Sequence, residues 1–294
     1  MGVINSTKAV SGRPCLKMVE RSTMISIIVP VYNEEDSVGK VIDDLRIAMK
    51  DSGYEYEIVA VDDGSTDRTS EIALARGVNA LCNIQNKGYG AALKKGINAS
   101  AGDYIAIIDA DGTYLAKELP GIIKLALENG HDMVVGSRDS SGLVVSTPRK
   151  IGKWIINGLA RYLSECDVPD INSGMRVMRS SVVKKFIPIL PEGFSFTTTI
   201  TLAMLTNEYS VKYLPINYCK RGGFSKIRPV KDTINFLVLI IRTIMYFNPL
   251  KIFLPFSLLL FFIAFGLMAY RIVFGRGFMV TSMTRSVQVV WPTL

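Results

Sequence analysis

The amino-acid sequence predicts an α/β protein, with a mostly parallel β-sheet flanked by helices, then a helix at a membrane interface and a C-terminal transmembrane helix. Strand-like apolar runs alternate with helical patterns over residues 25–138, the order that produces right-handed crossovers and a parallel sheet. Several of these runs end in acidic or amide side chains, as strands do at the ligand-binding edge of an open sheet. A long uncharged stretch near the C-terminus has the length of a membrane span.

Length and composition narrow the class of protein. The 294 residues suffice for one large domain and an appendage. The hydrophobic content of 49% and the mean hydropathy of +0.27 are high for a soluble protein. The four cysteines form no C-x-x-C pair, which argues against a zinc site or disulfide framework and fits a reducing compartment. The single histidine, His131, precedes an apolar run and is expected to be structural, so no Ser/His/Asp nucleophile system is predicted.

The net charge of +8 would suit nucleic acid, anionic lipid or phosphorylated substrates. The basic residues gather in two groups, within 138–161 and 220–231, and no nucleic-acid-binding motif accompanies them. We therefore expect lipid and phosphorylated partners and no nucleic acid, with a solvated basic face as the alternative for each group. Residues 1–22 lack the apolar core of a signal peptide and are expected to form a mobile tail.

The predicted strands are short apolar or β-branched runs bounded by turn residues. They lie at residues 25–31, 57–61, 78–82, 104–108, 132–138 and 213–218. Pro30 stands near the end of the first strand, where a missing backbone donor is tolerated. The strand at 213–218 contains a proline and is expected at an edge of the sheet.

The predicted helices carry apolar residues at helical spacing. They lie at residues 32–49, 69–76, 91–99, 119–127 and 149–163, and a further helix starts within 192–199. Acidic residues at the start of the first helix would suit the helix dipole. The small polar stretch at 140–147 is expected to be a mobile loop, and residues 170–176 a polar turn.

Polar side chains at three strand ends are expected to share one edge of the sheet. Asn33, Asp63 and Asp109 each follow a predicted parallel strand, and ligands of open parallel sheets bind beyond the carboxyl ends of the strands. Arg138, at the end of a later strand, is expected at the same edge. Three contributions to one edge are harder to explain by chance than any one of them.

A glycine-rich segment enters the helix at 91–99. Residues 86–90 read Asn-Lys-Gly-Tyr-Gly, but Leu93 stands where a dinucleotide-binding fingerprint would have its third glycine. Acidic strand ends also disfavour that reading. With Lys87 beside the glycines, the segment still suits a close approach to phosphate or sugar.

Asp109 and Asp111 directly follow the apolar strand 104–108. Alternate residues of an extended segment project the same way, so both carboxylates can face one hard cation and its phosphate oxygens. This pattern favours metal-assisted diphosphate chemistry. The alternative for an isolated Asp-x-Asp is a loop with a helix-capping aspartate.

The C-terminal part suggests attachment to a membrane. Residues 233–247 are apolar almost all round, as in a helix that lies at the membrane interface. Residues 252–270 are uncharged and would reach about 28 Å as a helix, close to the thickness of a bilayer core. A buried core helix is the alternative. The expected organisation is a tail at 1–22, a main domain at 23–230, a juxtamembrane helix at 231–250, a span at 251–274 and a tail at 275–294.

Several motifs together resemble the family 2 glycosyltransferases, in particular the polyprenyl-phosphate branch of dolichyl-phosphate mannose and glucose synthases. These motifs are Val-Pro-Val-Tyr-Asn-Glu at 29–34, Val-Asp-Asp-Gly-Ser-Thr-Asp at 61–67, the glycine-rich segment at 86–90, Asp-Ala-Asp at 109–111, Val-Gly-Ser-Arg at 135–138, Ser-Gly-Met-Arg at 173–176, and Arg221 with Ser225 and Lys226. The resemblance covers about residues 24–270. Relatives often continue the metal motif to a glutamine, whereas residues 112–114 here are Gly-Thr-Tyr.

The resemblance implies a GT-A (Rossmann-like) fold and assigns roles to individual residues. Asp109 and Asp111 would hold Mn²⁺ or Mg²⁺ on the diphosphate, and with Arg138 they are the candidate catalytic residues. The candidates for binding the nucleotide sugar are Pro30, Tyr32, Asn33, Glu34, Asp62, Asp63, Lys87, Gly88, Ala110 and Asp111. The candidates for binding the acceptor and the departing diphosphate are Arg138, Arg149, Lys153, Ser173, Arg221, Ser225 and Lys226.

The predicted activity is inverting transfer of a hexose from GDP-mannose or UDP-glucose to polyprenyl (dolichyl) phosphate. One alternative is transfer to another lipid or a polysaccharide, although the Q-x-x-R-W motif of processive synthases is missing. Another is an inactive membrane-anchored protein that binds nucleotide sugars. Lysine and arginine crowd the N-terminal flank of the span, which favours a membrane location with the catalytic domain facing the cytoplasm.

Overall fold

The computed structural model describes residues 23–138, 168–193, 195–219, 238, 245 and 249–274. The predicted loop at 140–147, the helix at 149–163, most of the helix at 233–247 and both tails lie outside the described residues. The described part of the main domain is an α/β structure, in agreement with the sequence-based prediction.

A seven-stranded sheet forms the centre of the domain, in the order β3-β2-β1-β4-β6-β5-β7. Its strands are β1 (Met24–Val31), β2 (Glu55–Asp62), β3 (Asn79–Cys82), β4 (Tyr104–Ile107), β5 (Met133–Arg138), β6 (Arg176–Arg179) and β7 (Val211–Ile216). Only the pairings of β6 with β4 and β5 are antiparallel. The mostly parallel sheet is therefore confirmed, and the last strand does lie at an edge.

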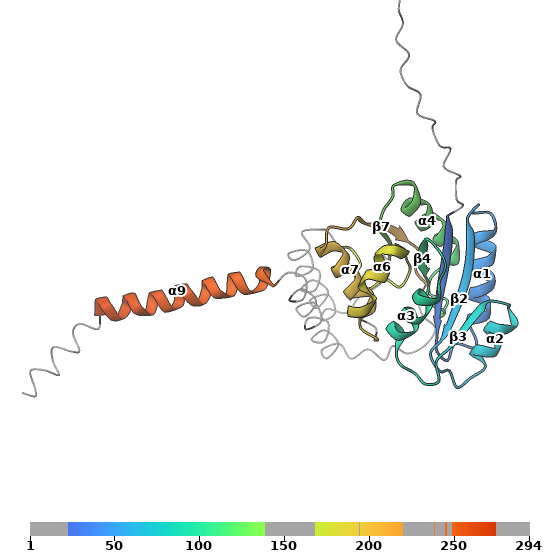
Figure 1. Ribbon diagram of the computed structural model, residues 1–294, viewed down its shortest axis with the longest axis horizontal. Helices are drawn as coiled ribbons and strands as arrows, with labels where there is room; N and C mark the ends of the chain where they lie inside the picture. Colours follow the sequence, from blue (N-terminus) through green and yellow to red (C-terminus); the bar gives the residue numbers. More distant parts are fainter. Residues whose placement is uncertain are drawn as a thin grey trace, which may run out of the picture.

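Helices cover both faces of the sheet (Figure 1). The helices α1 (Val38–Lys50), α2 (Thr69–Ala75) and α4 (Leu119–Glu128) pack on one face, in one buried apolar cluster. The helices α3 (Tyr89–Ala99), α6 (Ser180–Phe186) and α7 (Phe196–Thr206) pack on the other, in a second cluster. Short 3₁₀ turns lie at Ala116–Glu118 and Ile187–Ile189.

Strand β1 shows why the sequence folds in this way. Every residue from Ile25 to Val31 is buried, because a central strand is covered on both sides. Ile25 and Ile27 belong to the cluster under α1, while Ile28 belongs to the cluster under α3. The alternation of side chains along a strand thus feeds both cores.

The first helix begins later than expected, because residues 32–37 form a loop after β1. Helix α1 begins at Val38, and its first turn holds no acidic residue. Asn33 has φ 53°, in the left-handed region that asparagine tolerates. The backbone N–H groups of residues 33, 34 and 35 donate to side chains at Ser65, Thr69 and Asp67 instead of entering a helix.

The polar turn expected at residues 170–176 ends one residue earlier, at residue 175. Arg176 begins β6, and α6 follows directly. Neither element is predicted from the sequence, because Arg-Val-Met-Arg offers only two apolar residues between charges.

Helix α9 (Leu250–Phe274) contains the predicted span. Its segment Phe253–Ile272 is 20 residues long, with a mean hydropathy of 2.2, and is long and apolar enough to cross a membrane. None of that segment is buried against the described parts of the chain, which does not support the alternative of a core helix.

Candidate functional site

The three strand ends expected at one edge are brought together there. Strands β2, β1 and β4 are neighbours and run parallel, with Val31 opposite Asp62 and Ile28 opposite Ile107. Asn33, Asp63 and Asp109 therefore leave the sheet at the same carboxyl edge. This is where an open parallel sheet binds its ligands.

Asp109 is held from two sides. The Tyr89 hydroxyl, at the start of α3, donates to its Oδ1 over 2.8 Å. On the other side, the carboxylate packs on the backbone of Gly174, where an added Cβ would lie 2.3 Å from Oδ2. The contact requires a residue without a side chain at position 174.

Burial raises the pKa of Asp109 to about 6. The Tyr89 hydrogen bond opposes that shift, whereas the nearby Asp111 carboxylate adds to it by repulsion. Ionising both carboxylates is therefore costly without a compensating cation, and carboxylate oxygens are the ligands that Mn²⁺ and Mg²⁺ prefer. The pair fits a divalent metal. No cluster of three acidic, histidine or cysteine ligands occurs among the described residues.

Asp111 is oriented by its own loop. Its Oδ1 accepts hydrogen bonds from the Thr113 backbone N–H at 3.1 Å and from the Thr113 hydroxyl at 2.6 Å. The Thr113 carbonyl accepts from the backbone N–H of Cys219, and Tyr114 forms a β-bridge with Tyr218. The metal motif is thus tied to the chain that leaves β7.

Asp63 organises the glycine-rich segment. Its Oδ1 accepts from the Asn83 side chain at 2.8 Å and the Lys87 backbone N–H at 3.1 Å, and its Oδ2 accepts from the Gly88 N–H at 2.7 Å. Gly88 has φ 107°, a conformation that favours glycine. Asp63 therefore fixes the entry to α3, and its predicted contact with the nucleotide remains a prediction.

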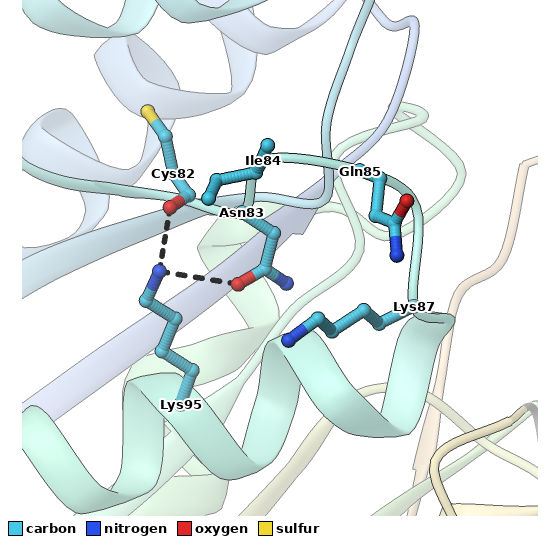
Figure 2. A pocket seen from close by; sticks show the side chains of 6 residues that line it. All are labelled: Cys82, Asn83, Ile84, Gln85, Lys87 and Lys95. Carbon is cyan, nitrogen blue, oxygen red and sulfur yellow. Dashed lines mark hydrogen bonds between the residues drawn. The ribbon is translucent and has the colours of Figure 1, made fainter.

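An open cavity of about 510 Å³ lies beside this segment (Figure 2). Its lining residues are Cys82, Asn83, Ile84, Gln85, Lys87 and Lys95. The Lys95 ammonium donates to the Cys82 carbonyl at 2.6 Å and the Asn83 side-chain oxygen at 3.1 Å. Neither metal-motif aspartate lines the cavity. Asp63 connects the cavity residue Asn83 to Gly88 of the glycine-rich segment.

Arg138 lies at the end of β5 and pairs with Asp170. Its Nε and Nη2 reach the two carboxylate oxygens at 2.7 and 2.9 Å, and its guanidinium lies 5.5 Å from the centre of the Tyr218 ring. Burial would raise the pKa of Asp170, but the hydrogen bond and charge of Arg138 hold it below its usual value. The reciprocal interaction raises the pKa of Arg138 against the effect of burial, so its charge is permanent.

Ser173 and Arg176 are fully buried. The Ser173 hydroxyl donates to the Gly136 carbonyl at 2.5 Å, so its predicted contact with the acceptor remains untested. Arg176 donates to the Ser173 carbonyl, and also to the Thr197 carbonyl at 3.1 Å and the Thr201 hydroxyl at 3.0 Å. Arg176 therefore connects α7 to residues 173–174, which lie against Asp109.

The remaining candidates fall into two groups. Pro30 and Ala110 are buried, Asp62 accepts from Ser65 in the turn after β2, Glu34 is half-buried, and Tyr32 is 44% exposed beside the edge. The others lie outside the described residues: Arg149, Lys153, Arg221, Ser225 and Lys226.

The structure also identifies site residues that the sequence analysis missed. Tyr89 and Gly174 contact Asp109, and Asp170 pairs with Arg138. Tyr89 and Gly174 lie inside quoted motifs, but Tyr89 is 20 positions from its partner and Asp170 is 32 from its own. Only the folded sheet edge brings them together.

Comparison with known proteins places these features in a family. A family model described as glycosyl transferase family 2 matches residues 26–187. An undecaprenyl-phosphate 4-deoxy-4-formamido-L-arabinose transferase of Edwardsiella ictaluri is 33% identical over 189 residues, which cover 59% of this chain and 57% of that protein. A dodecaprenyl-phosphate galacturonate synthase of Rhizobium johnstonii is 28% identical over 214 residues, covering 70% of this chain and 62% of that one.

Solved structures show the same fold. The glucosyl-3-phosphoglycerate synthase of Mycobacterium tuberculosis, crystallised with Mn²⁺, UDP and glucosyl-3-phosphoglycerate, superimposes with a TM-score of 0.60 at 20% identity, covering 81% of this chain and 86% of that one. This chain spans less than two thirds of the length of the two curated relatives named above. Since the family model spans more than half of the chain, the protein belongs to glycosyl transferase family 2.

Proposed function

We propose that this protein is a metal-dependent, inverting glycosyltransferase that moves a sugar from a nucleotide sugar to a polyprenyl phosphate at a membrane surface. The observation that carries the proposal is the pair Asp109 and Asp111 at the carboxyl edge of the sheet, after β4. Asp63, which holds the glycine-rich segment, lies at the same edge at the end of β2, with β1 between β2 and β4. The names of the relatives, which include two polyprenyl-phosphate sugar transferases, support the acceptor.

The donor would lie along the edge from β2 to β4. The nucleotide would contact Tyr32, Glu34 and the segment at Lys87 and Gly88, whose backbone approaches closely because glycine carries no side chain. Asp109 and Asp111 would hold Mn²⁺ or Mg²⁺, which supplies charge neutralisation on the departing diphosphate. The crystallised fold neighbour, with Mn²⁺ and UDP, supports a divalent metal.

The acceptor needs no strong base. A polyprenyl phosphate is already an anion near neutral pH, so one of its oxygens can attack the anomeric carbon directly. The new bond joins that carbon to the phosphate oxygen, the bond to the nucleotide diphosphate breaks with its electron pair, and the sugar configuration inverts. The remaining obstacle is repulsion between two anionic groups, which the permanent charge of Arg138 would reduce.

The chain would be organised around the membrane. The proposed division is a tail at 1–22, a catalytic domain at 23–230, a juxtamembrane helix at 231–250, a span at 251–274 and a tail at 275–294. The catalytic domain would face the cytoplasm, where nucleotide sugars are made. Cys82 is an exposed thiol of that domain. With the other three cysteines replaced by serine, an impermeant maleimide should label Cys82 in opened cells only; labelling in intact cells would contradict the orientation.

The donor sugar is the open part of the proposal. GDP-mannose and UDP-glucose are the sequence-based candidates, and the relatives' names add galacturonate and 4-deoxy-4-formamido-L-arabinose as candidate sugars. The test incubates membranes that contain the chain with Mn²⁺ and each labelled donor, then extracts lipid. Label in the organic phase that mild acid releases would support polyprenyl-phosphate transfer and identify the donor.

Two variants make that test specific. Asp111→Asn should nearly abolish the lipid-linked label, whereas Asp103→Asn should retain it, because Asp103 accepts from the Met24 backbone N–H at the opposite end of the sheet. Full activity of Asp111→Asn would contradict the metal role. Binding of nucleotides without transfer from any donor would favour an inactive binding protein.

A further inference from the structure

Tyr89 connects the glycine-rich segment at residues 86–90 to Asp109 of the metal motif. It is the first residue of α3 and directly follows Gly88. The backbone N–H groups of Lys87 and Gly88 are bound to the Asp63 carboxylate at the end of β2. The position of the Tyr89 backbone is therefore fixed by Asp63, at the end of β2.

The Tyr89 side chain reaches across the edge to β4. Its hydroxyl donates to Oδ1 of Asp109 over 2.8 Å, the usual length of an O–H···O hydrogen bond. A phenol keeps its proton near neutral pH, and an ionised carboxylate can only accept a hydrogen bond. Tyr89 therefore serves as a hydrogen-bond donor to the carboxylate.

Gly174 lies against the opposite side of the Asp109 carboxylate. The backbone of Gly174 lies so close that an added Cβ would stand 2.9 Å from Oδ1 and 2.3 Å from Oδ2. Two hydrogen bonds hold the backbone around Gly174 in place. The Arg176 side chain donates to the Ser173 carbonyl, and the Gly174 backbone N–H donates to the Tyr114 hydroxyl at 2.7 Å. The carboxylate is thus confined between a hydroxyl donor and a backbone wall.

We propose that Tyr89 is a positioning residue for the metal ligand Asp109, locking the orientation of this carboxylate to the glycine-rich segment that receives the donor. This inference rests on the proposed metal site. Residues that hydrogen-bond to metal ligands orient them, and their loss commonly costs about 10- to 100-fold in metal affinity or activity. Tyr89 would act through Asp109 and would not touch the cation itself.

The test is Mn²⁺ binding to the purified full chain in detergent, measured by calorimetry with UDP or GDP present. Tyr89→Phe keeps the partly buried ring and removes only the hydroxyl, so its metal-free unfolding temperature should stay close to that of the original chain. Its affinity for Mn²⁺ should fall by about 10- to 100-fold. Tyr104→Phe is the matched control, because Tyr104 is a buried tyrosine at the start of β4, remote from the metal motif.

Transfer kinetics separate positioning from a general loss of structure. In Tyr89→Phe, the Mn²⁺ concentration for half-maximal transfer should rise, while kcat at saturating Mn²⁺ should largely recover. Unchanged Mn²⁺ affinity in Tyr89→Phe, or an equal loss in Tyr104→Phe, would overturn the role of Tyr89 and leave the proposed function standing. Failure of the original chain to bind Mn²⁺ with either nucleotide would overturn both.

Discussion

The guanidinium of Arg138 and the carboxylate of Asp170 meet in a two-point ion pair, with N–O distances of 2.7 and 2.9 Å. The Arg138 backbone N–H also donates to Oδ2 of Asp170, at 3.2 Å. Three bonds thus join the end of β5 to the loop before β6. Because the guanidinium also faces the Tyr218 ring, its direction at the sheet edge is fixed before any ligand arrives.

Asp170→Asn should therefore impair transfer by loosening Arg138. The amide keeps the size of the side chain but loses its charge and one of its two acceptors. We expect kcat to fall by up to about 100-fold, the scale reported for a small misplacement of a catalytic group, with little change in the KM for the donor. Steady-state assays of lipid-linked product measure both constants.

The matched control is Asp132→Asn. Asp132 pairs with Arg179 at 3.1 Å, at the far end of β6 from the site. This variant removes the same chemical group without touching Arg138. Equal losses of kcat in the two variants would show that the Arg138 pair has no special role in transfer.

The same pair predicts how stability depends on pH. The pKa of Asp170 is lowered in the folded protein, so its contribution is fully present above the unfolded value of about 3.9 and is lost as pH falls through the folded value. Near neutral pH, the free energy of unfolding of the original chain should exceed that of Asp170→Asn by about 1–3 kcal/mol. That difference should shrink below about pH 4.

Denaturant titrations of both proteins in detergent, between about pH 2.5 and 7, measure this difference. Subtracting the variant removes the contribution of every other carboxylate. A difference that grows as the pH falls would contradict the sign of the shift. A constant difference would show that the pair contributes through packing alone.

The sequence predicted the sheet edge well because its signals are local. The apolar run before Asp109 and the polar residues that follow it are adjacent in the chain, and β1, β2 and β4 do lie side by side as expected. The position of Asp109 and Asp111 at this edge was therefore recognisable from the local sequence, while their metal role remains a proposal. The same holds for α9, where composition alone indicates a span.

Features that depend on contacts between distant residues could not be predicted from local sequence patterns. Arg176 is a charged residue at 0% exposure, and its burial becomes acceptable only when α7 and the Ser173 carbonyl supply acceptors. The start of α1 was placed too early because the backbone N–H groups of residues 33–35 are bound by the loop after β2. No pattern within residues 32–38 encodes those partners.

Gly174→Ala tests the wall behind Asp109. The new methyl group would fall within 2.3 Å of Oδ2, and the carboxylate is the part that can move. We expect loss of most Mn²⁺-dependent transfer and a destabilisation of about 1–3 kcal/mol from overpacking. Transfer assays and denaturant unfolding report the two effects separately.

Gly121→Ala provides the comparison for that variant. Gly121 lies in α4, and an added Cβ would meet only Leu214, at an ordinary 3.8 Å. Alanine also favours a helix over glycine by up to about 1 kcal/mol. This variant should keep full activity and equal or greater stability. Full activity in Gly174→Ala would instead mean that Asp109 tolerates displacement.

Helix α9 makes a prediction about membrane attachment. Replacing Leu259 and Phe262 by arginine puts two charges near the middle of the apolar segment, at about 2.5–3.5 kcal/mol each on insertion scales. The control is Phe253→Arg at the end of that segment, where a long side chain can reach the interface. After a carbonate wash, the double variant should leave the membrane fraction while the control stays.

The same fractions show what the attachment does for transfer. If α9 serves to bring the edge of β4 to the lipid, the released double variant should still bind UDP or GDP with Mn²⁺ but make little lipid-linked product from native membranes. Added short-chain polyprenyl phosphate in detergent should restore transfer, because the chemistry at Asp109 and Asp111 does not involve the helix. A double variant that stays in the membrane like the control would show that another part of the chain provides the attachment.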